Sequence, residues 1–279
     1  MTLYGRERPE AMKKLRGKVL VLGHDTRPLI AIFRSLGRQG IEVHVAGCKA
    51  TSPALRSRYL AAVHYLPRFE LAHNDWLKEL SALMDREAYD LVIPATEFTV
   101  LSCQRHADEL ARHGRVYLLA PKLYELVNDK AAIYEIVRRE GISAPGTVVV
   151  RKGSDAVETA CFKFPVFVKP SCSVTAEKRG LKDYAVRIEN AGELADYVER
   201  LFELHDHVLI QDTVTGQGAG MELLAHEGNI LLAFQHRRLH ESTGFGSSYR
   251  ESVSPDPELF EASKRLIKAL NYTGVAMLE

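Results

Sequence analysis

The sequence predicts an α/β module followed by an α+β module. Between residues 18 and 121, short continuous apolar runs alternate with amphipathic segments over short connections, a pattern typical of an open, mostly parallel sheet. After residue 124 the apolar segments include two long neighbours joined by Glu227–Gly228–Asn229, which indicates mixed or antiparallel sheets. A length of 279 residues suits about two domains. We therefore divide the chain into a frayed leader at 1–17, an α/β domain at 18–121 and an α+β domain at 122–279.

Composition and charge argue against several classes of protein. The formal net charge of +1 gives the chain as a whole no electrostatic basis for coating nucleic acid or an acidic membrane. The apolar run at 19–23 is far shorter than the roughly 20 residues that a membrane span needs. The leader has no apolar centre of the kind that signal peptides carry. The four cysteines are widely spaced without a CxxC pair, so a reducing cytoplasm is the expected location.

The first module begins with a buried strand, KVLVLGH, at 18–24. Leu29, Ile32, Phe33 and Leu36 follow at helical spacing and predict a helix that ends near the glycines at 37 and 40. Further strands are predicted at 41–47, 89–96 and 115–121, with a helix around 76–84. After the first strand, 23–30 reads GHDTRPLI and contains one glycine where a dinucleotide fingerprint needs three. This argues against a nicotinamide or flavin dehydrogenase.

The second module begins with a helix that Asn128 or Asp129 can cap and that stops at Gly141. Strands are predicted at 147–150, 164–170, 184–189, 207–212, 221–226, 229–241 and 274–279, and helices near 155–161, 191–204 and 255–270. The histidines show no metal-ligand spacing, and we expect His205 and His207 to lie in a solvated loop.

Two lysines are candidates for binding an anion. Lys130 lies in the first turn of its helix, where a cation opposes the helix dipole. It is either an exposed side chain or a phosphate ligand beside backbone N–H groups. Lys169 ends an otherwise apolar strand, so its ammonium must reach water or meet a negative partner.

The end of the strand at 207–212 is a third candidate feature. Gln211 can add its amide to the backbone groups that a strand end offers to a flat base, and Gly216, Gly218 and Gly220 permit close approach of a ligand. An ordinary flexible turn explains the same glycines.

Basic and acidic residues near the end of the chain complete the candidates. Period-2 alternation places His236 and Arg238 on one face of a strand, near Arg250, which suits an anionic substrate or a developing phosphoryl charge. The same charges would also protect an exposed edge strand. Glu279 ends a strand of small apolar residues, where a carboxylate needs either a cationic partner or a magnesium ion.

Taken in order, five segments of the chain resemble the ATP-grasp superfamily, and within it the carboxylate–amine ligase-like branch. The segments are LVNDKAAIYEIVRREGISAPGT, FPVFVKPS, VLIQDTVTGQGAG, QHRRLHE with GFGSS and RES, and YTGVAMLE. RPLIAIFRSLGRQGIEVHVAG in the first module resembles the Rossmann-like pre-ATP-grasp domain of that group. The resemblance extends over roughly 18–279 and implies a lid subdomain at about 145–214.

The resemblance also implies roles for single residues. Lys130 and Lys169 match the lysines that hold the nucleotide phosphates of ATP. The segment that reads adenine is matched by Gln211, Asp212, Val214 and Gly216. Glu279 matches the first carboxylate that binds Mg²⁺, and Arg238 and Arg250 match basic positions that we assign to the acyl-phosphate or carboxylate end of the substrate.

The sequence departs from the family pattern at three places. The loop after Lys169 carries one glycine, Gly180, where relatives have more. His240 stands in place of an arginine, and GFG at 244–246 replaces paired glycines. The second metal carboxylate and its partner asparagine should follow Glu279, so we expect an incomplete ATP-grasp domain with weak nucleotide binding and poor turnover.

The resemblance implies an ADP-forming ligase that activates a small-molecule carboxylate as an acyl phosphate for attack by an amine or a similar nucleophile. It is also compatible with a homodimer. One alternative is a non-catalytic protein that binds ATP or ADP or acts as a scaffold. A structural α/β protein without a ligand is the other.

Overall fold

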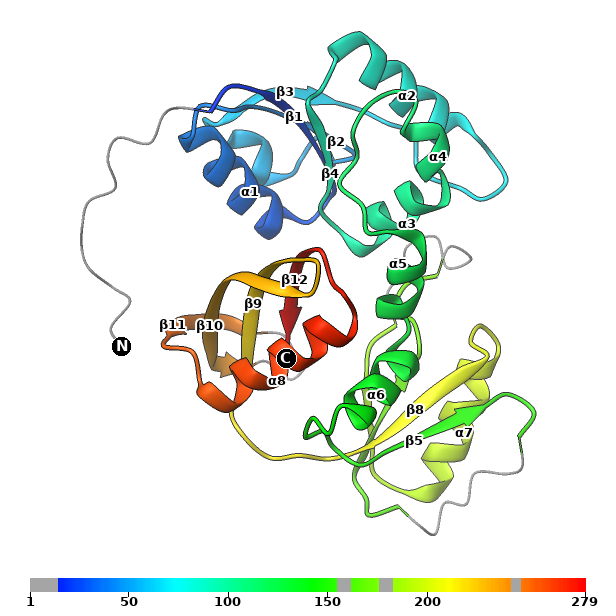
Figure 1. The fold of residues 1–279 in the computed structure, drawn as a ribbon. Helices are drawn as coiled ribbons and strands as arrows, with labels where there is room; N and C mark the ends of the chain where they lie inside the picture. The colour runs from blue at the N-terminus through cyan, green and yellow to red at the C-terminus, as the bar shows by residue number, and fades with distance from the viewer. Residues whose placement is uncertain (1–14, 155–161, 176–182, 242–246) are drawn as a thin grey trace. The chain divides into compact units, whose positions relative to one another are not determined.

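The computed structural model describes residues 15–154, 162–175, 183–241 and 247–279. Four predicted features therefore lie outside the described residues, namely most of the leader, the helix near 155–161, Gly180 and the GFG segment. The chain divides into two compact units, Met1–Leu118 with Val174–Leu181 and Leu119–Ser173 with Lys182–Glu279 (Figure 1).

The first unit contains a parallel four-stranded sheet in the order β3-β2-β1-β4. Its strands are β1 (Lys18–Leu22), β2 (Glu42–Ala46), β3 (Leu60–His64) and β4 (Leu91–Pro94). The connections contain α1 (Thr26–Arg38), the short 3-10 helix η1 (Pro53–Arg56), α2 (Asp75–Glu87), α3 (Glu97–Arg105) and α4 (Ala107–Leu110). The sheet is parallel because each of these strands returns through a crossover connection.

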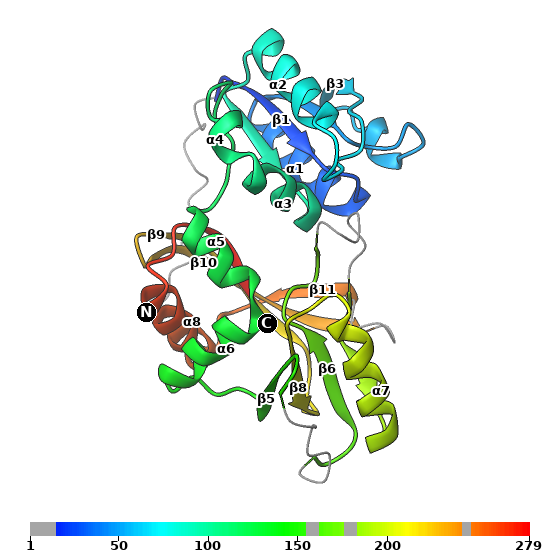
Figure 2. The ribbon, with the colours of Figure 1, turned by 90° about the vertical axis from the view of Figure 1, so that its right-hand side faces the viewer.

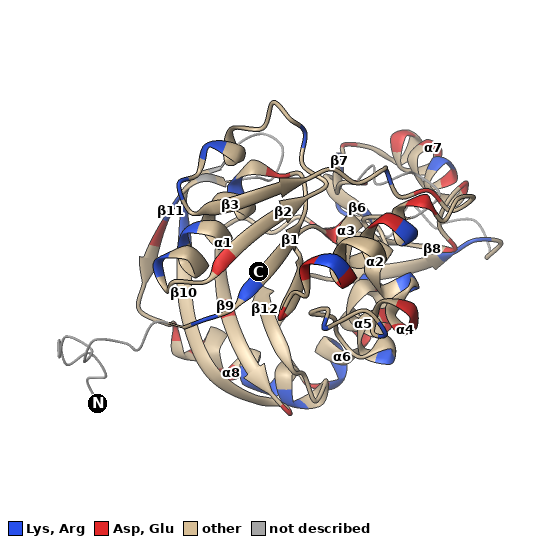
Figure 3. Ribbon diagram, turned by 90° about the horizontal axis from the view of Figure 1, so that it is seen from above, with Lys and Arg blue, Asp and Glu red and all other residues tan. Residues whose placement is uncertain are grey.

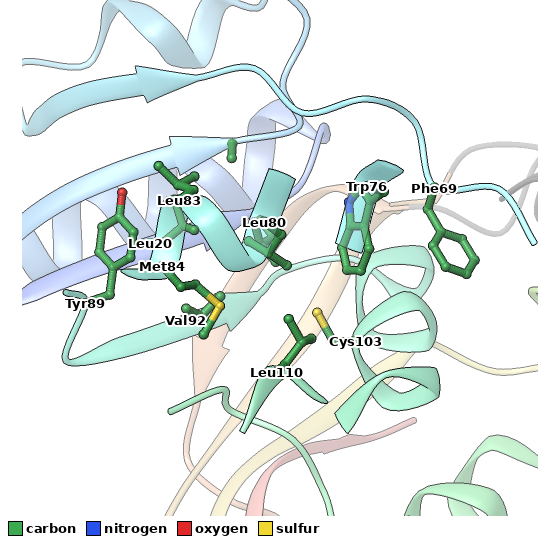
Figure 4. Close-up of a cluster of buried hydrophobic side chains, with 12 residues drawn as sticks. Leu20, Phe69, Trp76, Leu80, Leu83, Met84, Tyr89, Val92, Cys103 and Leu110 are labelled. Atoms are coloured by element: carbon green, nitrogen blue, oxygen red, sulfur yellow. The ribbon is translucent and has the colours of Figure 1, made fainter. Parts of the chain in front are cut away.

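Both faces of this sheet are buried, which explains the continuous apolar runs in its strands. Leu20 and Leu22 of β1 pack on one face in the cluster that includes Leu80 and Met84 of α2 (Figure 4). Val19 and Val21 point to the other face and pack with Leu29 and Phe33 of α1. The alternation along β1 therefore joins the sheet to a helix on each side.

Two predictions for the first unit are wrong. The segment at 115–121 is not a strand, because its parallel pairing with β4 stops after a single bridge between Val92 and Val116, and Pro121 then begins α5 (Pro121–Asn128). β3 was not predicted, because it is a short run with two alanines and none of its side chains is fully buried.

The second unit contains two sheets, and all of their strand pairs are antiparallel, which confirms the predicted change of architecture. The first sheet has the order β5-β8-β6-β7. Its strands are β5 (Thr147–Arg151), β6 (Val166–Pro170), β7 (Val186–Ile188) and β8 (His207–Asp212). One face packs against α7 (Ala191–Phe202) through a core that includes Val166, Ile210 and Val198 (Figure 2).

The second sheet has the order β11-β10-β9-β12. Its strands are β9 (Ala219–His226), β10 (Asn229–Glu241), β11 (Ser247–Val253) and β12 (Gly274–Leu278). One face packs against α8 (Pro257–Ala269) through Met221, Leu223 and Ile267. β9 and β10 turn at Glu227 and Gly228, which both have positive φ, as tight hairpins require. β11 was not predicted as a strand separate from the preceding turn.

Among the helices that the structure describes, none combines the length and the apolar character needed to cross a membrane.

Candidate functional site

A cavity of about 930 Å³ lies within the second unit, between its two sheets and the helices α6 (Lys130–Arg139) and α8. Its volume falls within the roughly 300–1,000 Å³ of small-molecule sites. Six of the predicted site residues line it, namely Lys130, Lys169, Gln211, Val214, Arg238 and Glu279. Its lining therefore contains three cationic side chains and one carboxylate, an excess of positive charge that suits an anionic ligand.

Lys130 is fixed at the start of α6. The carboxylate of Asp129 caps the helix by accepting hydrogen bonds from the backbone N–H groups of Ala131 and Ala132, at 2.9 and 3.5 Å, which selects Asp129 over Asn128 as the cap. The Lys130 ammonium donates to Ser173 Oγ at 2.8 Å and to the Ser171 carbonyl at 3.3 Å. The side chain is therefore half-buried and directed at the segment after β6 rather than extended into solvent.

The predicted solvated loop for His205 and His207 is wrong. His205 is buried, and its Nε2 lies 3.1 Å from Asp183 Oδ2. His207 begins β8, and its Nε2 lies 3.0 Å from Asp129 Oδ2. Because Asp129 also caps α6, this contact ties the strand to the helix that carries Lys130. Sequence spacing could not reveal it, since the two residues are 78 positions apart.

Lys169 and Gln211 lie on the same face of the β5-β8-β6-β7 sheet, the face that lines the cavity. The Lys169 ammonium donates to Gln211 Oε1 at 2.5 Å, and Gln211 Nε2 donates to Thr147 Oγ1 at 2.9 Å. This hydrogen-bonded row crosses β6, β8 and β5. The ammonium can only donate, so the row fixes the orientation of the Gln211 amide.

Burial lowers the pKa of Lys169 below its ordinary value of 10.5. The ammonium has therefore lost part of its hydration, and its partner Gln211 is neutral. An anionic ligand in the cavity would compensate this charge better than an amide does. Of the two sequence interpretations, the structure favours a lysine that faces the cavity over one that extends fully into water.

The other predicted residues of the hinge lie differently from Gln211. Val214 lines the cavity and is 66% exposed. Asp212 does not line it, and alternation along β8 places its side chain on the sheet face opposite Gln211. Its backbone N–H donates to the Gly146 carbonyl at 2.8 Å. Gly216 lies in open space and likewise does not line the cavity, so nucleotide binding by Asp212 and Gly216 stays a prediction.

At the other end of the cavity, two arginines converge on one carboxylate. Arg238 Nη2 lies 2.5 Å from Glu279 Oε1, and Arg250 Nη2 lies 3.9 Å from the same oxygen. Arg238 of β10 and Arg250 of β11 are direct cross-strand partners, so their side chains share one sheet face. Arg250 does not line the cavity itself. The Arg238 side chain is 14% exposed and the Glu279 side chain 36%, so the ion pair is shielded from water mainly on the arginine side.

A partly buried acid–histidine pair on the same sheet face was not predicted from the sequence. His236 Nδ1 lies 2.6 Å from Glu222 Oε1. Glu222 Oε2, His236 Nε2 and Arg238 Nε are buried without a hydrogen-bond partner in the described part of the chain. Gly220 leaves the space for the imidazole, because a Cβ there would lie 2.5 Å from His236 Cε1. The available signal was a single glutamate in the middle of a mostly apolar strand.

The donor set around Glu279 permits a magnesium ion only when a ligand supplies further oxygens. Among the described residues no group of three His, Cys, Asp or Glu side chains could hold a metal by itself. Mg²⁺, however, usually takes one or two carboxylates together with substrate phosphates and water. Glu279 offers one carboxylate at the edge of a cavity lined with cations, so it fits an ion that arrives with phosphate oxygens.

Comparison with known protein families finds no match to the sequence, and comparison with curated proteins finds none either. Solved structures do match. An L-amino acid ligase from Bacillus licheniformis is 16% identical with a TM-score of 0.67, over 94% of this chain and 62% of that one. A D-alanine–D-alanine ligase from Bacillus anthracis, complexed with ATP, is 18% identical with a TM-score of 0.56, over 94% and 80%.

A third match is the biotin carboxylase domain dimer of a 2-oxoglutarate carboxylase from Hydrogenobacter thermophilus, in complex with ADP, magnesium ADP and bicarbonate. It is 17% identical with a TM-score of 0.67, over 94% of this chain and 60% of that one. The chain thus shares its fold with these ligase and carboxylase structures, which confirms the resemblance to the ATP-grasp superfamily at the level of the fold. It spans less than two thirds of the length of the L-amino acid ligase.

Proposed function

We propose that the cavity of the second unit binds ATP and that the protein uses it to activate a carboxylate as an acyl phosphate, releasing ADP. An amine or a similar nucleophile then displaces the phosphate. The observation that carries this proposal is the convergence of Lys130, Lys169, Gln211, Val214, Arg238 and Glu279 on one cavity from separate elements. Similarity to the ligase structures supports the reaction class.

The phosphates fit between the two lysines. Lys130 presents its ammonium from the first turn of α6, where the positive end of the helix dipole adds to its charge. Lys169 presents a partly dehydrated ammonium from β6. The two therefore neutralise a polyphosphate chain from two sides, and each forms hydrogen bonds that orient it before a ligand binds.

The adenine fits against the end of β8. Leu209, Gln211 and Val214 line this part of the cavity, and Ile133 and Tyr134 of α6 line it as well. An apolar enclosure with a few polar groups suits a flat base. Thr147 holds Gln211 at one end and Lys169 holds it at the other, so the amide is fixed without the ligand.

Arg238 and Arg250 fit the reacting end of the substrate. Both guanidinium groups face Glu279, and the unpartnered Nε of Arg238 is buried. In phosphoryl transfer such groups act by positioning the reactants and stabilising the charge that develops on the transferred phosphoryl oxygens. Glu279 would hold a magnesium ion together with phosphate oxygens, and the ion would supply further charge neutralisation when bound.

A non-catalytic nucleotide-binding protein is the second candidate, and the Arg238–Glu279 ion pair favours it. Glu279 is engaged by an arginine at 2.5 Å, so its charge is compensated by the protein itself. A protein that only binds nucleotide needs the lysines and Gln211 but not a complete metal cage. This candidate predicts nucleotide binding without consumption of ATP.

Trapping with hydroxylamine tests the proposal, because hydroxylamine converts an acyl phosphate into a coloured hydroxamate. The protein is incubated with ATP, magnesium and a panel of carboxylates, and hydroxamate and ADP are measured together. We expect equal amounts of both products with the correct carboxylate, and loss of both in Arg238→Gln. Saturable binding of ADP without any hydroxamate supports the binding protein instead, and failure to bind ADP at about 1 mM contradicts both candidates.

A further inference from the structure

A second pocket, of about 510 Å³, lies in the first unit and shares no residue with the cavity of the second. Its polar lining consists of Arg34, Arg38, Arg56, Ser57, Arg58 and Tyr59. Four guanidinium groups thus surround one concave surface, and none of the described acidic side chains lines it. We refer to it as the arginine pocket. Figure 3 shows the basic positions along α1 in blue.

The fold brings these arginines together through local contacts. Arg34 and Arg38 are four residues apart on α1 and therefore share one helix face. Ser52 caps η1, which carries Arg56, and its Oγ also lies 3.2 Å from Thr26 Oγ1 at the start of α1. This contact ties η1 to the helix.

Tyr59 is seated directly on α1. A Cβ at Gly37 would lie 2.6 Å from Tyr59 Cβ, so only glycine permits this approach. The Tyr59 hydroxyl accepts a hydrogen bond from Arg58 Nη2 at 2.9 Å, and the Arg58 guanidinium lies 4.9 Å from the ring centroid. Hydrogen bonds from Arg58 and Arg38 lower the pKa of Tyr59. The phenol therefore holds these two guanidinium groups at the pocket.

The described residues do not compensate the charge of the pocket. None of the four arginines forms an ion pair with a carboxylate in the described ranges, whereas Arg27 on the same helix lies 3.9 Å from Asp25. Like charges gathered on one surface repel each other and oppose folding. Since the chain as a whole carries a net charge of only +1, this local excess of positive charge points to an anion.

We propose that the arginine pocket binds a small phosphorylated molecule with more than one negative charge. A guanidinium group donates two parallel hydrogen bonds to phosphate, and four such groups exceed what a single carboxylate would neutralise. The volume suits a small molecule, and Ile30 and Pro53 provide apolar surface for its uncharged part. Ser57 offers a hydroxyl to the same ligand.

Titration calorimetry with inorganic pyrophosphate, without magnesium and at constant ionic strength, tests this proposal. The Lys130→Met/Lys169→Met protein serves as the background, because it removes the two ammonium groups proposed to bind phosphate in the other cavity. We expect one pyrophosphate per chain there. Adding Arg34→Gln/Arg56→Gln should weaken binding about tenfold or more, because it removes two charge-assisted contacts. Arg27→Gln is the matched control and should leave the affinity unchanged.

Several results would overturn the proposal. These are an unchanged affinity in Arg34→Gln/Arg56→Gln, an equal loss in Arg27→Gln, and no saturable binding up to about 10 mM pyrophosphate. Citrate that binds as tightly as pyrophosphate would overturn the assignment to phosphate. Thermal unfolding without any anion provides an independent check. Because the substitutions relieve repulsion among the arginines, the Tm of the protein carrying Arg34→Gln/Arg56→Gln should equal or exceed that of the Lys130→Met/Lys169→Met background. A lower Tm would contradict the claim that the charge of the cluster is uncompensated.

Discussion

Replacing Lys169 with methionine should weaken binding of magnesium ADP without unfolding the protein. Methionine keeps much of the aliphatic length and removes the ammonium that lies 2.5 Å from Gln211 Oε1. A charge-assisted hydrogen bond to phosphate contributes about 1.5–3 kcal/mol, so the Kd should rise about 10-fold to 150-fold. Stability should change little, because losing one hydrogen bond to Gln211, about 1 kcal/mol, is offset by relief of a partly buried charge.

Calorimetric titration with magnesium ADP measures this change, and thermal unfolding without nucleotide shows whether the variant is folded. Lys152→Met is the matched control, because Lys152 is an exposed lysine just after β5 of the same sheet and does not line the cavity. The reasoning predicts a wild-type Kd for this control. A Kd of Lys169→Met within about twofold of wild type, or an equal loss in Lys152→Met, would refute the assignment of Lys169 to the phosphates.

Three further predictions concern the same unit. Because burial places the pKa of Lys169 below 10.5, raising the pH toward 10.5 removes the Lys169 proton from the folded protein before it does so from the unfolded chain. The Lys169 contribution to stability should therefore rise while the affinity for ADP falls. Lys169→Arg should remove this fall in affinity when ADP titrations across alkaline pH are compared. Asp129→Ala should lower the free energy of unfolding, measured by urea denaturation, by about 0.5–2 kcal/mol through loss of the α6 cap. Asp129→Asn should retain most of the stability that the cap contributes, and equal losses in the two variants would contradict the capping role. Gly220→Ala should cost about 1–3 kcal/mol, because its Cβ would lie 2.5 Å from His236 Cε1, whereas Gly216→Ala in open space should cost far less; similar melting temperatures for the two variants would argue against this packing.

Most elements of the fold were predictable because their sequence patterns are strong. The continuous apolar run of β1 and the helical spacing on α1 each reflect burial that the structure confirms. β3 was missed because its side chains are only partly buried, so its pattern lacks the apolar contrast that marks a strand. The segment at 115–121 was wrongly predicted to be a strand, because its apolar residues pack against the core but do not form an extended pairing with a neighbouring strand.

Six of the nine predicted site residues line one cavity, but the contacts between them were not predictable. Lys169 stood out because a charge in an apolar strand needs a partner, yet the sequence could not show that the partner is Gln211 on the neighbouring strand. The contact between His207 and Asp129 and the pair of His236 with Glu222 were not predicted. Both depend on tertiary packing or strand register, which local patterns do not specify.

A crystal structure of the protein with magnesium and a non-hydrolysable ATP analogue tests the central claim most directly. The account predicts that the triphosphate lies within hydrogen-bonding distance, roughly 3 Å, of both the Lys130 and Lys169 ammonium groups, with the adenine against Gln211 and Val214. A nucleotide bound elsewhere, or this cavity empty at saturating analogue, would contradict the account.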